Sequence, residues 1–170
     1  RLQDAIDARP DGAFPKALLA LEGTLEARFE RGANSADVEE DFAGLLREMR
    51  GRDAGAGRAL DGPHRSDLIV MHRPKNMPID LCSTGEQKAL LITVMLCHAQ
   101  LLRHWRGVAP LLLLDDIAAH LDETRRAALY DWLLTLGSQF WLSGTETAFF
   151  APLRDKAQFF HIQHGTVRAA

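Results

Sequence analysis

The stretch Leu111-Leu112-Leu113-Leu114-Asp115-Asp116 decides the fold class of this chain. Its apolar run, counted from about residue 108, predicts a short strand buried on both faces, as strands of a parallel sheet are. Two carboxylates directly after such a strand need a cation or polar partners, because burying a free charge is costly. Mg²⁺ near the first acid would meet that need and leave the second acid to orient an attacking water. The alternative is a plain strand that ends in a solvated turn with two acids.

A second stretch, LCSTGEQK at residues 81–88, opens a long helix predicted over about 86–105. Small residues with free backbone amides at a helix N-terminus form an anion site, which the helix dipole strengthens. Ser83 would add a hydroxyl donor, and Gly85 would let a phosphate approach the backbone. The alternative is an ordinary cap, in which one of the two hydroxyl residues caps the helix and a following Glu or Gln completes a capping box.

A third stretch, Ala119-His120-Leu121-Asp122, follows the two acids closely. Asp122 is a good N-cap for a helix predicted over about 123–136, and a simple capping role is its alternative. Two more strands are predicted at 139–142 and 158–163. Strands that alternate with helices predict an α/β fold, with a parallel-type sheet flanked by helices.

The N-terminal part of the chain has a different pattern. Apolar residues at helical spacing predict one helix within 13–31 and a second over about 36–49. Residues 50–60 carry Gly, Ala and Arg without periodicity and predict a loop. We therefore expect two domains: residues 1–60, a helical annex with a linker, and residues 61–170, the α/β part.

Composition excludes several classes of protein. With 170 residues, 46% hydrophobic and 25% charged, the chain suits one globular unit, and its net charge of −3 gives no basic footprint over the whole domain. Two cysteines are too few for a disulfide framework and suggest reduced thiols in the cytosol. No apolar run approaches the ~20 residues that cross a bilayer, and no leader is recognisable. Because the first residue is Arg1, we expect a piece of a longer protein.

Together and in this order, the three stretches resemble the signature motif, the Walker B strand and the D-loop of ABC-type ATPases. The segment DGPHRSDL at 61–68 and the Asp-Asp pair resemble the RecF family, bacterial recombinational-repair ATPases of the SMC-like branch. The resemblance covers about residues 15–168, with its motifs concentrated in 61–146. It implies the C-terminal lobe of an ABC-type P-loop ATPase head, with an N-terminal helical annex.

The resemblance also implies roles for four residues outside the signature segment. Asp115 corresponds to the Walker B acid that supports Mg²⁺, and Asp116 to the catalytic base. Asp122 corresponds to the D-loop acid that crosses a dimer interface. Ser143 and Thr145 lie where transporter domains carry a switch histidine, and Thr145 is assigned as a γ-phosphate sensor.

In the signature segment, the resemblance implies that three residues contact the γ-phosphate of ATP bound by the opposite subunit: Ser83, Gly85 and Gln87. A P-loop requires Gly-x-x-x-x-Gly-Lys-Ser/Thr, and no Gly-Lys dipeptide occurs in the 170 residues. We therefore expect ATP and Mg²⁺ as cofactors only together with an N-terminal half. ATPase activity is expected in the full-length parent and not in this piece alone.

The function implied is that of a DNA-binding repair protein that dimerises on ATP and helps load repair proteins at DNA gaps. The implied partners are DNA, RecR of the RecO/RecR machinery and a second copy of the protein, in the cytoplasm and without a membrane. Two alternatives stay open at this point. One is a head fragment of another SMC-like ATPase, and the other is a non-enzymatic interaction module whose acid pair is only structural.

Overall fold

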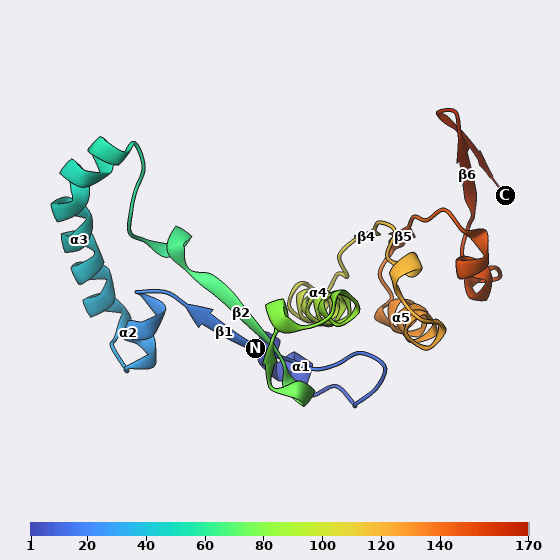
Figure 1. The fold of residues 1–170 in the computed structure, drawn as a ribbon, viewed down its shortest axis with the longest axis horizontal. Helices are drawn as coiled ribbons and strands as arrows, with labels where there is room; N and C mark the ends of the chain where they lie inside the picture. Colours follow the sequence, from blue (N-terminus) through green and yellow to red (C-terminus); the bar gives the residue numbers. More distant parts are fainter. Residues whose placement is uncertain (170) are drawn as a thin grey trace. The chain divides into compact units, whose positions relative to one another are not determined.

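A computed structural model describes residues 1–169 (Figure 1). The chain divides into a larger unit, residues 1–17 with those from His72 onward, and a smaller unit, Leu18–Met71. Each unit is described by itself. The domain boundary predicted near residue 60 stays a prediction, and residue 170 lies outside the described residues.

Two helices form the core of the larger unit. Helix α4 (Thr84–Arg106) begins after Ser83 and ends at Gly107, whose left-handed backbone (φ 70°) stops the helix. Its buried residues recur every three or four positions, so one face is covered along most of its length: Ala89, Leu90, Ile92, Thr93, Leu96, Cys97 and Ala99. Helix α5 (Glu123–Leu136) contributes Leu129, Tyr130, Leu133 and Leu136 to the same core. Helix α1 (Leu2–Asp7) packs against α4.

Strands β4 (Leu112–Leu114) and β5 (Phe140–Leu142) run parallel, with Leu114 opposite Leu142. The predicted α/β class with a parallel sheet is therefore confirmed. The prediction that β4 is buried on both faces is wrong within this chain, because Leu112 and Leu114 are buried but Leu113 is 72% exposed. The helical core covers only one face of the pair.

The remaining segments of the larger unit are short. Strands β6 (Phe160–Gln163) and β7 (Thr166–Ala169) form an antiparallel hairpin through His164 and Gly165. The other elements are one short strand and four 3₁₀ helices: η2 (Arg73–Lys75), β3 (Met77–Pro78), η3 (Ile79–Leu81), η4 (Ala118–His120) and η5 (Thr147–Leu153). No helix among residues 1–169 is both long enough and apolar enough to span a bilayer.

The smaller unit corrects two predictions. The helix predicted within 13–31 is strand β1 (Ala17–Glu22) followed by the short helix α2 (Glu26–Glu30). The second predicted helix is confirmed as α3 (Ser35–Ala56), which continues through most of the predicted loop before Gly57 ends it in a left-handed conformation. Strand β2 (Asp67–His72) pairs with β1, and η1 (Pro63–Arg65) precedes it.

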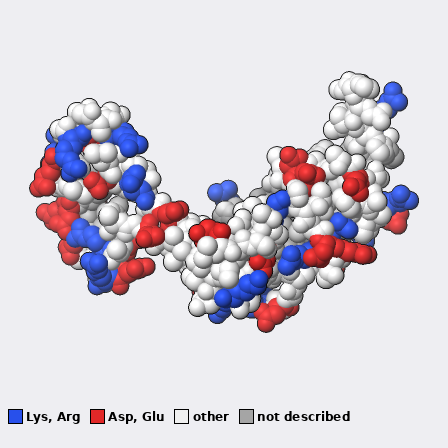
Figure 2. Space-filling view, in the orientation of Figure 1, with Lys and Arg blue, Asp and Glu red and all other residues white. Residues whose placement is uncertain are grey.

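Charged side chains of both signs are interspersed over the visible faces of both units (Figure 2). This distribution agrees with the small net charge of the sequence. An ion pair between Arg28 of α2 and Asp41 of α3 joins the two helices of the smaller unit. The visible surface therefore offers no single-signed field that would identify a partner by charge alone.

Candidate functional site

The two acids lie at the carboxyl edge of the parallel pair, where Ser143 joins them. Asp115 and Asp116 follow β4, and Ser143 follows β5. The Ser143 N–H donates to the Leu114 carbonyl at 3.1 Å and continues the ladder beyond the strands. The Ser143 hydroxyl donates to Asp115 Oδ1, and its oxygen accepts from the Asp116 N–H at 3.0 Å. One hydroxyl therefore fixes a side chain of the first acid and the backbone of the second.

Asp116 has an unusual backbone. Its φ of 48° places it in the left-handed region, which Asp and Asn tolerate better than most side chains do. The bond to Ser143 holds this conformation. Nε2 of His120 lies 3.7 Å from Asp116 Oδ2, and both side chains are about half exposed. The second acid is thus directed to solvent beside a residue that can carry a proton.

A cavity of about 730 Å³ opens next to the first acid. Asp115, Ser143 and Thr145 are among its polar lining residues. Much of the remaining wall is apolar and includes Trp141 and Phe160, whose rings stack with centroids 6.1 Å apart. The structure therefore brings the predicted switch residue Thr145 to the same cavity as the predicted metal acid.

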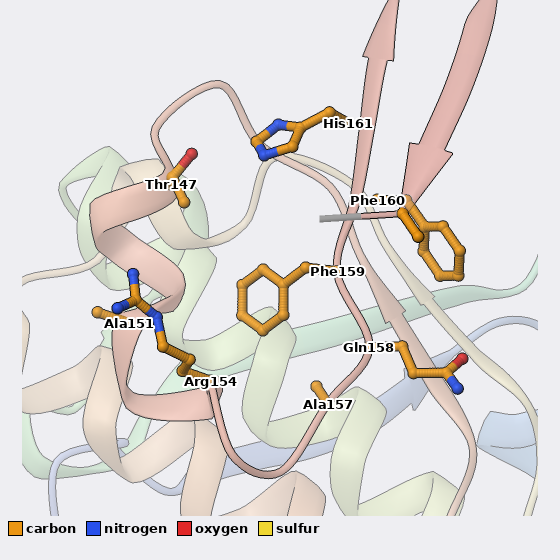
Figure 3. Close-up of a pocket in the computed structure, with 9 residues that line it drawn as sticks. Thr147, Ala151, Arg154, Ala157, Gln158, Phe159, Phe160 and His161 are labelled. Carbon is orange, nitrogen blue, oxygen red and sulfur yellow. The ribbon is translucent and has the colours of Figure 1, made fainter.

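A neighbouring cavity of about 700 Å³ lies between η5 and β6 (Figure 3). Thr147, Ala151 and Arg154 line it from the side of η5, and Phe159 and His161 line it from the other side. Several lining residues are shared with the first cavity, so the two form one depression beside the sheet edge. No residue predicted for the site lines this second part.

Ser83 caps helix α4 in a complete capping box. Its oxygen accepts from the Glu86 N–H at 3.4 Å, and its own N–H and hydroxyl donate to Glu86 Oε2 at 3.0 and 2.9 Å. The capping alternative is thus present in the structure. It does not exclude the anion role, because Ser83 is exposed and a Cβ at Gly85 would meet no atom within 4 Å.

Two further polar residues of the segment, Gln87 and Glu86, are engaged within the chain. Gln87 Nε2 donates to the carbonyls of Ile79 and Cys82 at 3.0 and 3.1 Å, which holds the loop before α4. Glu86 pairs with Lys75. The Lys75 ammonium first, and then the two bonds from Ser83, lower the pKa of Glu86 to about 2.

Asp122 is the N-cap of α5. Its Oδ1 accepts from the Arg125 N–H at 2.8 Å, and its Oδ2 lies 3.7 Å from Arg125 Nε. The side chain remains 59% exposed, so it is accessible from outside the chain. Its D-loop role stays a prediction.

The structure separates the predicted residues into two groups. Asp115, Asp116 and Thr145 gather at the edge of the sheet. The signature residues lie at the start of α4, and none of them lines the cavity beside Asp115. The sequence placed Ser143 in the switch segment, as a hydroxyl directly after the next strand, but did not predict its bonds to both acids.

No protein-family model matches the chain. Curated relatives match almost all of it: the DNA replication and repair protein RecF of Brucella abortus is 58% identical over 156 residues, which are 91% of this chain and 40% of the relative. The protein of the same description from Agrobacterium fabrum is 52% identical over 169 residues, which are 99% of this chain and 44% of the relative. This chain is homologous to the C-terminal part of RecF. The RecF-like chain spans less than half the length of these relatives.

Two solved structures share the fold. They are described as the recombination mediator protein RecF-ATPrS and RecF-ATP in the RecFOR pathway. The TM-scores are 0.68 and 0.67, with 18% and 20% identity, and each match covers 99% of this chain and 43% of the other. These matches confirm the predicted α/β fold and show that the RecF-like chain shares the fold of these RecF structures over almost its whole length.

Proposed function

We propose that this chain is part of a RecF-like DNA repair ATPase and supplies the Walker B acids and the signature segment of a composite ATP site. The observation that carries the proposal is the Ser143 hydroxyl that joins both acids at the carboxyl edge of the parallel strands. Ligands of open α/β sheets bind at this edge. An acid pair with a purely structural role would need no such shared anchor beside an open cavity.

Asp115 suits Mg²⁺ by the chemistry of its surroundings. The donors there are a carboxylate and hydroxyls, which hard cations prefer. Among residues 1–169 no group of three or more His, Cys, Asp or Glu could hold a metal by itself. This fits Mg²⁺, which binds through one or two carboxylates together with substrate phosphates. When bound, the ion would neutralise charge on the phosphoryl group.

Asp116 is proposed as the base that orients the attacking water. The Ser143 bond to its N–H fixes the left-handed backbone from which the carboxylate projects, and half of its side chain is open to solvent. A carboxylate held in this way can accept the proton of a water in line with a γ-phosphate. His120, 3.7 Å away, is placed to pair with the carboxylate when the imidazole is protonated.

The signature segment is proposed to act in trans. Ser83 and the half-buried but unobstructed backbone at Gly85 would contact the γ-phosphate held by a second copy, and Gln87 would hold the loop that presents them. Asp122 and Thr145 would complete the interface and sense the γ-phosphate. By homology we also propose DNA and RecR as partners, loading of repair proteins at DNA gaps, and a cytoplasmic location. The matches with RecF favour this proposal over another SMC-like head.

The acids are tested in the full-length parent. Asp116→Asn keeps a side chain that tolerates the left-handed backbone, so we expect ATP binding to persist, turnover to fall at least ~100-fold and an ATP-bound dimer to accumulate. Asp115→Ala should instead weaken Mg²⁺-dependent ATP binding. Asp131→Asn removes an exposed acid of α5 and should change neither quantity. Unchanged turnover in both site variants would contradict the Walker B assignment.

The trans role is tested with Ser83→Arg, measured by light scattering with and without ATP. A long cation in the seam should block ATP-dependent dimerisation and hydrolysis while each monomer still binds ATP. If Ser83 is only a helix cap, the variant loses about 0.5–2 kcal/mol of stability and dimerises normally. An unchanged dimer would thus support the purely structural alternative.

A further inference from the structure

The turn that precedes β3 is anchored firmly in the larger unit. The Arg73 N–H donates to the Lys16 carbonyl at 3.0 Å, and Arg73 Nη1 pairs with Asp7 at 2.5 Å. His72 is buried, and its Nδ1 accepts from the Lys75 N–H at 3.3 Å. These contacts fix the backbone of Lys75 relative to the start of α4.

Lys75 reaches the capping box of α4 through Glu86. Its ammonium pairs with Glu86 Oε1, while Oε2 of the same carboxylate accepts the N–H and the hydroxyl of Ser83. The Glu86 side chain is 17% exposed and the Lys75 side chain 49%. One carboxylate therefore connects an anchored cation to the hydroxyl that is proposed to meet a γ-phosphate.

This arrangement has an electrostatic consequence for an incoming anion. The Glu86 carboxylate lies 2.9 Å from Ser83 Oγ, so an unpaired negative charge there would repel a triphosphate docking on Ser83. The Lys75 ammonium pairs with the other oxygen of this carboxylate and offsets its charge. It also keeps the carboxylate in the orientation that the cap requires.

We propose that Lys75 is a positioning residue of the signature segment: through Glu86 it fixes the Ser83 hydroxyl and neutralises the carboxylate beside the seam where the partner's ATP would arrive. This inference rests on the proposed function. A merely structural Lys75 would fasten the turn to α4 and affect only the stability of the fold. The two roles differ in whether ATP-dependent dimerisation responds to the charge of Glu86.

The experiment measures ATP-dependent dimerisation of the full-length parent by light scattering across a range of ATP concentrations. Lys75→Met should raise the ATP concentration at half-dimerisation about tenfold, the scale of one charged hydrogen bond. Lys75→Arg, which keeps the cation, should restore most of the response. Lys156→Met, at an exposed lysine in the same unit, controls for the general loss of a positive charge.

The deciding variant is Lys75→Met combined with Glu86→Gln. The amide still accepts hydrogen bonds from Ser83 but carries no charge, so the double variant should return close to wild type. A double variant as impaired as Lys75→Met, or more so, would overturn the inference and indicate a direct contact of Lys75 with phosphate. Circular dichroism at the assay temperature separates these outcomes from unfolding.

Failure of the proposed function has a different signature. A dimer that requires ATP and is lost in Ser83→Arg, but is unchanged in Lys75→Met, contradicts only the role of Lys75. If the wild-type parent does not dimerise with ATP, the trans site itself is contradicted, and the inference with it. The same holds if the Ser83→Arg variant dimerises with ATP as the wild type does.

Discussion

Removing the Ser143 hydroxyl is the sharpest perturbation of the candidate site, because the group contacts both acids without contacting ATP in the proposed mechanism. Ser143→Ala deletes the bond to Asp115 and the acceptor for the Asp116 N–H. Asp116 then loses the Ser143 bond that stabilises its left-handed backbone (φ 48°). We expect the pair to relax away from the observed geometry.

The size of the effect follows from these contacts. A neutral hydrogen bond contributes about 0.5–1.5 kcal/mol and a charged one about 1.5–3 kcal/mol, with the low ends suited to exposed groups such as these. A left-handed non-glycine residue costs about 1–2 kcal/mol, which the Ser143 bond offsets. A loss of about 2 kcal/mol in the preference for the active geometry corresponds to a roughly 30-fold fall in kcat.

The assay is steady-state ATP hydrolysis by the full-length parent, with ATP affinity measured separately in the absence of Mg²⁺. kcat should fall about 30-fold, and the metal-free affinity should stay unchanged because the acids do not contact the nucleotide without the ion. Ser138→Ala is the matched control at the other end of β5. The Ser138 hydroxyl is buried and has no hydrogen-bond partner among the described residues, so its removal should leave kcat unchanged and should not lower stability.

Two results would refute this reasoning. A kcat within twofold of wild type in Ser143→Ala would show that the acids hold their geometry without the hydroxyl. An equal fall in Ser138→Ala would show that the assay reports general disturbance of β5.

The remaining predictions concern two titratable groups of α4: the buried thiol of Cys97 and the paired carboxylate of Glu86. Burial raises the pKa of the Cys97 thiol, and the Arg9 guanidinium opposes this only in part, so alkylation at pH 8 should be slower in the folded than in the unfolded protein by at least ~100-fold. Comparable rates in the two states would contradict the burial. For Glu86, a folded-state pKa of about 2 against the usual 4.5 means that the ionised form stabilises the fold above about pH 4.5, and that this contribution is lost as the pH falls towards 2. The difference in unfolding free energy between wild type and Glu86→Gln should therefore be constant from pH 8 to 5 and shrink below that, whereas a difference independent of pH down to 2 would show that Glu86 is not paired.

Helices with local start and stop signals were predicted well from the sequence. The helix predicted over 123–136 has those bounds in the structure, and the one predicted over 86–105 is Thr84–Arg106. Side-chain caps at the N-terminus and left-handed glycines at the C-terminus act within a few residues of the helix end. Their effect is therefore readable without knowledge of the rest of the fold.

Prediction failed where a distant partner decided the conformation. The apolar residues of Ala17–Glu22 suit a helix or a strand, and pairing with β2 selects the strand. Local pattern could not decide this case, because the competing states differ little in intrinsic propensity.

The loop predicted at 50–60 was wrong for a different, local reason. The run after residue 49 carries glycines but also alanines and arginines that favour helix, so α3 continues to Ala56.

The sequence by itself determined which residues can carry the chemistry: the acid pair after an apolar strand, the Ser-Thr-Gly segment before a long helix, and the family that this order resembles. Only the tertiary structure decided how they are held. Parallel pairing of β4 with β5 brings Ser143 to both acids, and the anchored turn at 73–75 brings Lys75 to Glu86. The sequence shows the hydroxyl after the second strand and the lysine in the turn but not the groups they contact, because hydrogen bonds and ion pairs between separate elements form only where strand register and packing place the groups within reach of each other.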